Sequence, residues 1–327
     1  MRLQYRFMEY LDRIPTRQDI ADTSQAIFEF VHYTPVLTCE SINQITGADL
    51  FFKCENFQKI GAFKMRGASS AAIRLSEAAL QLGLATHSSG NHAQAVARAA
   101  QLLGIPAYIV MPENAPAIKK SATRGYGAEI IYCEPTIEAR EATLAEVVSR
   151  TGATFIHPFD DYNVIAGQAT CAFELFQDVE ELDTIMVPVG GGGLLSGTAL
   201  STRYWSPGTK VIGAEPEAVN DAWRSFHSGK IEVNTSINTI ADGLRTNLGE
   251  RTFDIIQKHV DDIITVSEEA IVEAMRLVWE RMKIIIEPSC SVPLAAILHN
   301  KDRFANEKIG IILTGGNVDL DILPFGK

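Results

Sequence analysis

The stretch that decides the fold reads Val187-Pro188-Val189-Gly190-Gly191-Gly192-Gly193-Leu194-Leu195-Ser196-Gly197. A short apolar run enters consecutive glycines and continues at once into a helix-like pattern. Without Cβ atoms a backbone can wrap closely around an anion, and its N–H groups converge at the positive end of the following helix. The pattern is neither G-x-G-x-x-G nor a P-loop. A flexible turn is the alternative, but ordering so many glycines loses much chain entropy, so we expect a phosphate-binding loop.

Strand-like and helix-like segments alternate on both sides of this stretch. Apolar and β-branched runs predict strands at residues 50–54, 107–111, 129–132, 154–156, 184–187, 210–214, 262–266 and 308–313. Helical periodicity predicts helices at residues 91–103, 137–150, 194–204 and 268–282. Such alternation predicts an α/β fold with open, mostly parallel sheets that are covered by helices.

The 327 residues suggest two domains, at ~150 residues each. The central segment holds about three βα repeats of its own, so we expect a small domain at residues 73–155. Residues 1–72 and 156–327 are expected to combine into a large domain.

Composition excludes several classes of protein. With 29 Lys and Arg against 40 Asp and Glu, the formal net charge is −11, and no basic run offsets it. We therefore expect no nucleic-acid partner. No apolar stretch approaches the ~20 residues of a membrane span, and the first residues lack the apolar core of a signal peptide. The five cysteines are scattered and never form a C-x-x-C pair, which favours reduced thiols. We expect a cytoplasmic enzyme with no membrane partner.

Three further motifs carry chemistry. Lys64 follows a glycine turn and begins an amphipathic helix, where a lysine with a lowered pKa can form a Schiff base; an ordinary surface lysine is the alternative.

The run His87-Ser88-Ser89-Gly90-Asn91-His92 gathers hydroxyls, an amide and free N–H groups at a helix start. These groups suit a carboxylate ligand, although a plain N-cap has the same residue types. Ile312-Leu313-Thr314-Gly315-Gly316-Asn317 ends a strand with a hydroxyl residue and a glycine pair, which by itself reads as a tight turn.

Together these motifs supply what pyridoxal phosphate requires: an amine, a phosphate cradle and a hydroxyl for the ring nitrogen. Their order resembles the fold-type II pyridoxal-phosphate enzymes of the serine/threonine dehydratase and serine racemase family. The likeness extends from Tyr33-Thr34-Pro35-Val36-Leu37 to Gly315-Gly316-Asn317-Val318-Asp319. The resemblance implies a fold like that of the tryptophan synthase β subunit, with two open, mostly parallel α/β domains and the active site between them.

The resemblance also assigns roles at the cofactor. Lys64 holds the cofactor covalently and later removes the substrate Cα proton, and Phe63 packs against the ring. Asn91 hydrogen-bonds the phenolic oxygen. Thr314 meets the pyridine nitrogen, where a neutral hydroxyl favours prompt loss of a β-leaving group. The phosphate lies on Gly190, Gly191, Gly192, Gly193 and Leu194.

The substrate and metal residues follow from the same resemblance. The loop that grips the substrate carboxylate is Ser88, Ser89, Asn91 and His92, and Ser89 matches the serine that exchanges a proton on the face opposite the lysine in racemases. Arg140 matches a position that can bind a second carboxylate, with a solvated helix arginine as the alternative. Glu215, the Val219 carbonyl and Asp221 match a site for a divalent cation such as Mg, Ca or Mn, with a solvated acidic turn as the alternative. A homodimer is implied, and Arg281 with Lys283 suggests an ATP effector.

The expected reaction is β-elimination of L-serine or L-threonine, a small β-hydroxy amino acid, to a 2-oxo acid and ammonia, with some serine racemisation. The alternatives are a threo-3-hydroxyaspartate dehydratase and a true serine racemase. Asn247 and Phe159 stand where animal serine racemases carry serine and asparagine, which weakens racemisation as the main activity. A β-replacement enzyme and a ligand-binding protein without activity are further alternatives.

Overall fold

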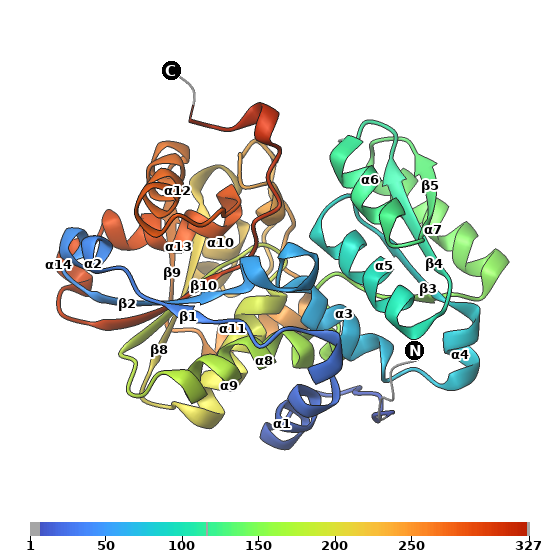
Figure 1. Ribbon diagram of the computed structural model, residues 1–327, viewed down its shortest axis with the longest axis horizontal. Helices are drawn as coiled ribbons and strands as arrows, with labels where there is room; N and C mark the ends of the chain where they lie inside the picture. Colours follow the sequence, from blue (N-terminus) through green and yellow to red (C-terminus); the bar gives the residue numbers. More distant parts are fainter. Residues whose placement is uncertain (1–6, 116, 326–327) are drawn as a thin grey trace.

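The computed structural model describes residues 7–115 and 117–325, which form two sheets side by side (Figure 1). The larger sheet has the order β1-β2-β10-β7-β8-β9 and is parallel except for the β1–β2 pair. The smaller sheet has the order β5-β4-β3-β6 and is parallel throughout. The strands are β1 (Val36–Leu37), β2 (Asp49–Cys54), β3 (Leu84–His87), β4 (Ala107–Pro112), β5 (Glu129–Cys133), β6 (Thr154–Phe155), β7 (Thr184–Pro188), β8 (Lys210–Pro216), β9 (Asp262–Val266) and β10 (Lys308–Leu313).

Helices cover both sheets. In the larger part α13 packs on the central strands with α12 behind it, while α8 and α9 lie together and contact the sheet through β10, β7 and β8. In the smaller part α5 and α7 both pack on β3 and β4. The α-helices are α1 (Arg17–Ala26), α2 (Glu40–Thr46), α3 (Lys64–Ala72), α4 (Glu77–Leu82), α5 (Asn91–Leu103), α6 (Ala117–Gly125), α7 (Ile137–Thr151), α8 (Tyr162–Asp178), α9 (Gly193–Trp205), α10 (Asp221–Ser228), α11 (Glu250–His259), α12 (Glu268–Met282), α13 (Pro288–Leu298) and α14 (Lys301–Phe304). Short 3₁₀ turns are η1 (Phe28–Phe30), η2 (Glu55–Phe57), η3 (Lys59–Gly61), η4 (Glu217–Val219), η5 (Asp242–Leu244) and η6 (Leu320–Ile322).

The expected α/β class, the predicted strands and the predicted helices are confirmed, with ends that differ by up to two residues. The largest difference is in β8, which was expected to end at residue 214. It continues to Pro216, because Glu215 and Pro216 still pair with Thr265 and Val266 of β9. Strand β3 lies outside the strand ranges predicted from the sequence, since it is short and ends on polar residues. The smaller sheet lies wholly within residues 84–155, and the division into domains at residues 73 and 155 stays our proposal.

Helix α3 lies where the two parts meet and is fastened by buried charges. Arg66 is fully buried, and its guanidinium donates to Glu55 of η2 at 2.7 Å and to Glu174 of α8 at 2.6 Å. The buried Lys53 of β2 pairs with Glu174 at 2.9 Å. Removing one partner of such a network leaves a charge without compensation, at a cost of about 3–5 kcal/mol. The network therefore holds the start of α3, where Lys64 stands.

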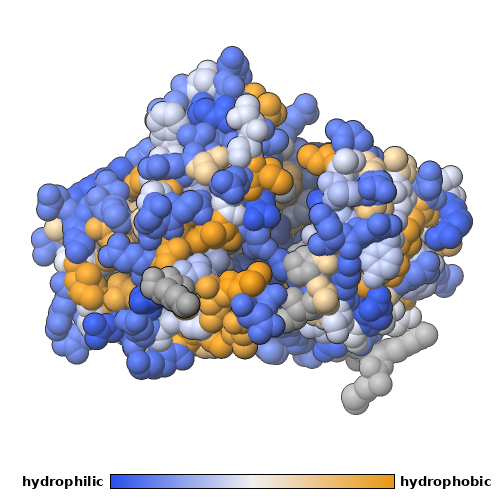
Figure 2. Space-filling view, turned by 90° about the horizontal axis from the view of Figure 1, so that it is seen from above, coloured by the Kyte–Doolittle hydropathy of each residue, from blue (hydrophilic) through white to orange (hydrophobic). Residues whose placement is uncertain are grey.

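The parallel strands of both sheets direct their carboxyl ends to one region. Ligands of open α/β sheets bind beyond these ends, because the loops and helix N-termini that follow the strands converge there. In the larger sheet β7 leads into the glycine run and β10 into Thr314, and in the smaller sheet β3 leads into Ser88. In the space-filling view a hollow opens between the two parts (Figure 2).

Candidate active site

Lys64 is the first residue of α3 and its amine lies in the interior of the site. Its Nζ donates to the carbonyl oxygen of Pro158 at 2.7 Å and lies 5.2 Å from the centre of the Phe63 ring. Loss of solvation lowers the pKa of Lys64 to about 8 because burial penalises the ammonium form. About one tenth of the amine is therefore neutral and nucleophilic at pH 7, far more than for an ordinary lysine.

The glycine run forms a tight cradle at the start of α9. Gly192 has φ +86°, a conformation that favours glycine. A Cβ on Gly191 would lie 2.3 Å from the Phe159 ring, and one on Gly190 would lie 3.0 Å from Leu244 Cα. The side chain of Leu194 is buried in the core, so this residue offers the phosphate only its backbone. The cradle fits a phosphate held by N–H groups at a helix N-terminus.

The segment from Ser88 to His92 leads from the end of β3 into the start of α5. Ser88 and Ser89 are half-buried, and the Ser88 hydroxyl accepts from Gly90 N at 3.3 Å. The His92 ring contacts the Ile156 carbonyl oxygen through Nε2 at 2.9 Å, while its buried Nδ1 has no partner. Burial, with Lys64 close by, lowers the pKa of His92 to about 3, so the ring is neutral. This position suits it for holding the segment against the smaller sheet, and the hydroxyls of Ser88 and Ser89 remain for substrate.

Thr314 follows β10 and provides the direct test of whether a cofactor fits. It is only 3% exposed, and its Oγ1 has no oxygen or nitrogen partner among the described residues, although it lies against the weakly polar Cys290 thiol. Its carbonyl oxygen accepts from Phe63 N at 3.0 Å, which ties it to the residue before Lys64. An unpaired buried hydroxyl costs about 1–3 kcal/mol, and a ring nitrogen at this place would satisfy it. With the amine and the cradle, the residues present fit pyridoxal phosphate.

Arg140 lies on the first turn of α7, near the carboxyl end of the smaller sheet. It is half-buried, and its buried Nε has no hydrogen-bond partner within the described part of the chain. Burial lowers the pKa of His87, Glu141 opposes this shift and Arg140 adds to it, so two charged side chains of the first turns of α7 act on the residue before Ser88. A half-buried guanidinium whose Nε lacks an acceptor is suited to a carboxylate ligand.

Glu215 and Asp221 approach each other between β8 and α10, with Val219 buried between them in the sequence. Glu215 accepts from Ala222 N at 3.1 Å and Trp223 N at 2.9 Å, and Asp221 accepts from Leu248 N at 2.9 Å. Burial raises the pKa of both carboxyls, that of Asp221 to about 6. In the described ranges no three or more His, Cys, Asp or Glu side chains form a ready metal cluster. The cation therefore stays a proposal.

Two of the departures from serine racemases have structural partners. Asn247 uses its Oδ1 to accept from Asn234 N at 2.8 Å, which holds a loop beside Asp221. Phe159 covers the glycine run and packs edge-on against His157 with ring centres 4.8 Å apart. Arg281 and Lys283 are exposed at the end of α12.

Four residues that complete the site were given no role by the sequence. Glu287, at the start of α13, accepts from Asn91 Nδ2 at 2.9 Å, and Asn317 Nδ2 donates to Asn91 Oδ1 at 2.9 Å. Asp242 of η5 pairs with Lys119 of α6, so an ion pair joins the two parts. A lone acid between the apolar run at residues 284–286 and Pro288 was the available signal for Glu287.

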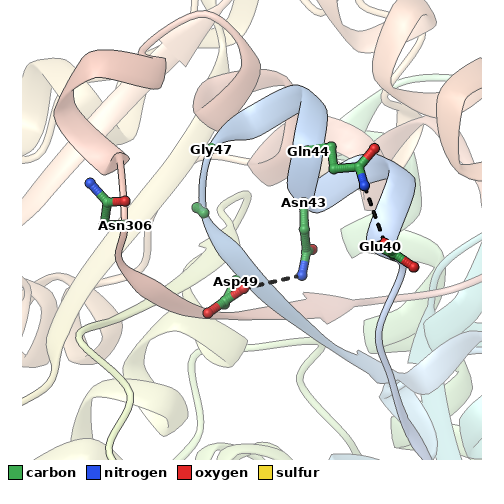
Figure 3. A pocket seen from close by; sticks show the side chains of 7 residues that line it. Glu40, Asn43, Gln44, Gly47, Asp49 and Asn306 are labelled. Carbon is green, nitrogen blue, oxygen red and sulfur yellow. Dashed lines mark hydrogen bonds between the residues drawn. The ribbon is translucent and has the colours of Figure 1, made fainter.

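A separate hollow of about 440 Å³ lies at the opposite edge of the larger sheet, where β2 and β10 begin (Figure 3). Its polar side chains bond to one another: Gln44 donates to Glu40 at 3.2 Å and Asn43 to Asp49 at 3.5 Å. It therefore presents no set of unpaired groups comparable to the site.

Comparison with known proteins places this geometry in a family. The family model described as pyridoxal-phosphate dependent enzyme matches residues 27–315. The chain belongs to this family, as the amine, the cradle and the unpaired hydroxyl require.

Proteins similar to this chain match it over nearly its whole length. The chain is 49% identical to a beta-hydroxyaspartate dehydratase of Paracoccus denitrificans, over 95% of this chain and 99% of that protein. It is 50% identical to an L-threo-3-hydroxyaspartate ammonia-lyase of Saccharomyces cerevisiae, over 94% of both chains. The crystal structure of serine racemase from Dictyostelium discoideum matches with a TM-score of 0.89 and 50% identity, over 93% of this chain and 99% of that chain. The chain is thus a pyridoxal-phosphate enzyme whose relatives are ammonia-lyases and racemases, as the resemblance implied.

Among the described helices, none has the length and apolar character needed to span a bilayer.

Proposed function

We propose that this protein is an ammonia-lyase that acts on β-hydroxy amino acids and prefers 3-hydroxyaspartate over serine and threonine. The observation that carries the preference is Arg140, whose buried Nε lacks a partner beside the carboxylate-binding segment. Serine and threonine have no group for this guanidinium, whereas the second carboxylate of hydroxyaspartate pairs with it. The names of two relatives agree with this choice.

The residues of the site divide the work of elimination. Pyridoxal phosphate, when bound, withdraws electrons from the substrate Cα. The segment from Ser88 to Asn91 binds the α-carboxylate at the N-terminus of α5, while Arg140 holds the distal one. The Lys64 amine takes the Cα proton and delivers a proton to the departing Cβ hydroxyl, which leaves as water. The released enamine hydrolyses to a 2-oxo acid and ammonia. Phe63 and Phe159 exclude water from the amine and the cradle.

Serine racemisation is the second candidate function, and Ser89 favours it. Ser89 is half-buried and lies in the segment between β3 and α5 of the smaller part. Lys64 lies on a different element, the first turn of α3. Two proton-exchanging groups from separate elements meet the need of a racemase for opposite faces.

A divalent cation at Glu215 and Asp221 is part of the proposal. Both carboxylates are fully buried, and Arg224, the nearest cation in the sequence, pairs with Glu232 at 3.8 Å. A hydrated magnesium or calcium ion that also takes the Val219 carbonyl would neutralise the pair. A homodimer and an ATP effector at Arg281 and Lys283 stay predictions.

The test is 2-oxo acid release from L-threo-3-hydroxyaspartate, L-serine, L-threonine and D-serine by the cofactor-loaded protein, with magnesium and then with a chelator. We expect kcat/KM for hydroxyaspartate to exceed that for serine by about 100-fold or more, because a site built for a charged group discriminates strongly against substrates that lack it. A preference for serine or threonine would contradict the assignment and favour the simpler dehydratase. Activity that survives chelation unchanged would contradict the cation.

A further inference from the structure

Glu287 is a buried acid that takes no part in the proposed elimination. It is 4% exposed and precedes α13, but its side chain makes no capping bond to that helix. Its backbone N–H donates to the Gly315 carbonyl oxygen at 3.0 Å, which fixes it beside the loop after Thr314. A Cβ on Gly315 would lie 2.9 Å from Glu287 Oε1, so the carboxylate lies directly against this loop. The acid thus borders the place of the cofactor ring.

Asn91 contacts Glu287 from the other side of the site. Its Nδ2 donates to Glu287 Oε1 at 2.9 Å and lies 3.2 Å from Oε2. Its Oδ1 accepts from Asn317 Nδ2 at 2.9 Å, and Asn317 also donates to the Ile60 carbonyl oxygen at 2.8 Å. A carboxylate accepts and an amide N–H₂ donates, so the two neighbours permit only one orientation of the Asn91 amide.

This orientation leaves one hydrogen of Asn91 available. The amide nitrogen carries two hydrogens, and Glu287 takes one of them. In the reversed orientation Asn91 Oδ1 would face the carboxylate, and Nδ2 would face the N–H₂ group of Asn317. Such an amide would present an acceptor, not a donor, to the oxygen on the cofactor ring.

We propose that Glu287 is a positioning residue, which orients the Asn91 amide so that its second N–H is directed at the ring oxygen of the cofactor. Glu287 belongs to the larger part and Asn91 to the smaller part, so the same bond also holds the two parts in register across the site. The inference rests on cofactor binding, which the family establishes, and is independent of which substrate is preferred.

The charged groups around Glu287 make its protonation state observable in the visible absorption of the bound cofactor. Asp242 of η5 faces it with like charge, Lys119 of α6 pairs with Asp242, and Cys290 lies on its own helix. Burial, reinforced by Asp242, raises the pKa of Glu287 to about 7. A carboxyl that changes charge next to a bound chromophore alters its visible absorption over the same pH range.

The test is a double-mutant cycle read by cofactor binding without substrate. The variants are Glu287→Leu, Asn91→Ala and their combination, with apo-protein titrated by pyridoxal phosphate. We expect Glu287→Leu to weaken cofactor affinity about tenfold when Asn91 is present, and less than about twofold in the Asn91→Ala protein. The control is Glu269→Gln, which removes an exposed carboxylate from the first turn of α12 and is expected to bind the cofactor like wild type.

A second variant separates charge from hydrogen bonding. Glu287→Gln still offers an acceptor to Asn91, so we expect a smaller loss of affinity, but the change of the visible spectrum near pH 7 should disappear. Equal losses from Glu287→Leu in both Asn91 backgrounds would overturn the proposal, because the acid would then act without Asn91. A spectral change near pH 7 that persists in Glu287→Gln would overturn it as well. Turnover is not measured, so a wrong substrate assignment leaves these results intact.

Discussion

The amine of Lys64 donates a 2.7 Å hydrogen bond to the carbonyl oxygen of Pro158, which precedes the phenylalanine that covers the glycine run. The bond joins the start of α3 to the segment after β6 and places the nucleophile next to the phosphate cradle. Among the described residues the amine bonds to a neutral carbonyl and to no anion, so desolvation sets its pKa at about 8.

The rate at which apo-protein captures pyridoxal phosphate should rise with pH up to about 8 and then level off. Only the neutral amine attacks the aldehyde, and with a pKa near 8 instead of 10.5 its neutral fraction at pH 7 is roughly two orders of magnitude larger. Stopped-flow absorbance across pH 6–10 measures this rate. Lys64→Ala should neither capture the cofactor covalently nor turn over substrate; normal turnover by that variant would rule out the assignment.

Ser89→Ala should remove D/L interconversion of serine and leave elimination of the L-substrate within about threefold. The reason is that Lys64 alone serves the proton on its own face, while Ser89 supplies the exchange from the other side. Chiral chromatography of serine and 2-oxo acid release measure the two activities in one sample. If both fell equally, Ser89 would be a substrate-binding residue only.

Gly191→Ala should weaken cofactor binding and destabilise the protein by about 1–3 kcal/mol, since the added methyl overlaps the Phe159 ring. Phe159→Leu in the same chain should recover part of the loss. Thermal unfolding with and without cofactor measures both effects. Gly208→Ala is the matched control, because a Cβ there meets nothing within 4 Å. A Gly191→Ala protein as stable as the control would show that the Phe159 ring moves aside freely.

Arg140→Lys and Arg140→Ala should lower kcat/KM for hydroxyaspartate by about 10²-fold or more, while activity on serine changes little. The distal carboxylate of hydroxyaspartate loses its bidentate partner in both variants. The lysine ammonium is a point charge and cannot reproduce the two parallel hydrogen bonds of the planar guanidinium. Steady-state kinetics on both substrates give the comparison. An equal fall on the two substrates would mean that Arg140 supports the fold and not selectivity.

Magnesium should raise the midpoint of thermal unfolding of metal-free protein by a few degrees. A ligand at 100 times its Kd stabilises the native state by about 2.7 kcal/mol. Asp221→Asn should abolish this dependence on magnesium, because it removes one of the two buried carboxylates. An unchanged magnesium response in that variant would place the cation elsewhere.

Local sequence predicted the α/β class, and local motifs together with the family resemblance pointed to the glycine cradle and to Lys64, Ser89 and Thr314. Each depends on neighbours within a few residues: an apolar run before glycines, a turn before a lysine, a hydroxyl at a strand end. The order of the motifs along the chain, through the family resemblance, also implied that they meet at one cofactor.

Only the tertiary structure decided which distant side chains complete the site. Glu287 and Asn91 are 196 residues apart, and Lys119 and Asp242 are 123 residues apart. Phe159 covers Gly191 because the segment after β6 crosses the start of α9. Such pairs leave no periodic or spacing signal in the chain, since their contact depends on how two separately folded sheets pack. The sequence therefore identifies the groups that do the chemistry, while packing between the two parts selects the groups that orient them.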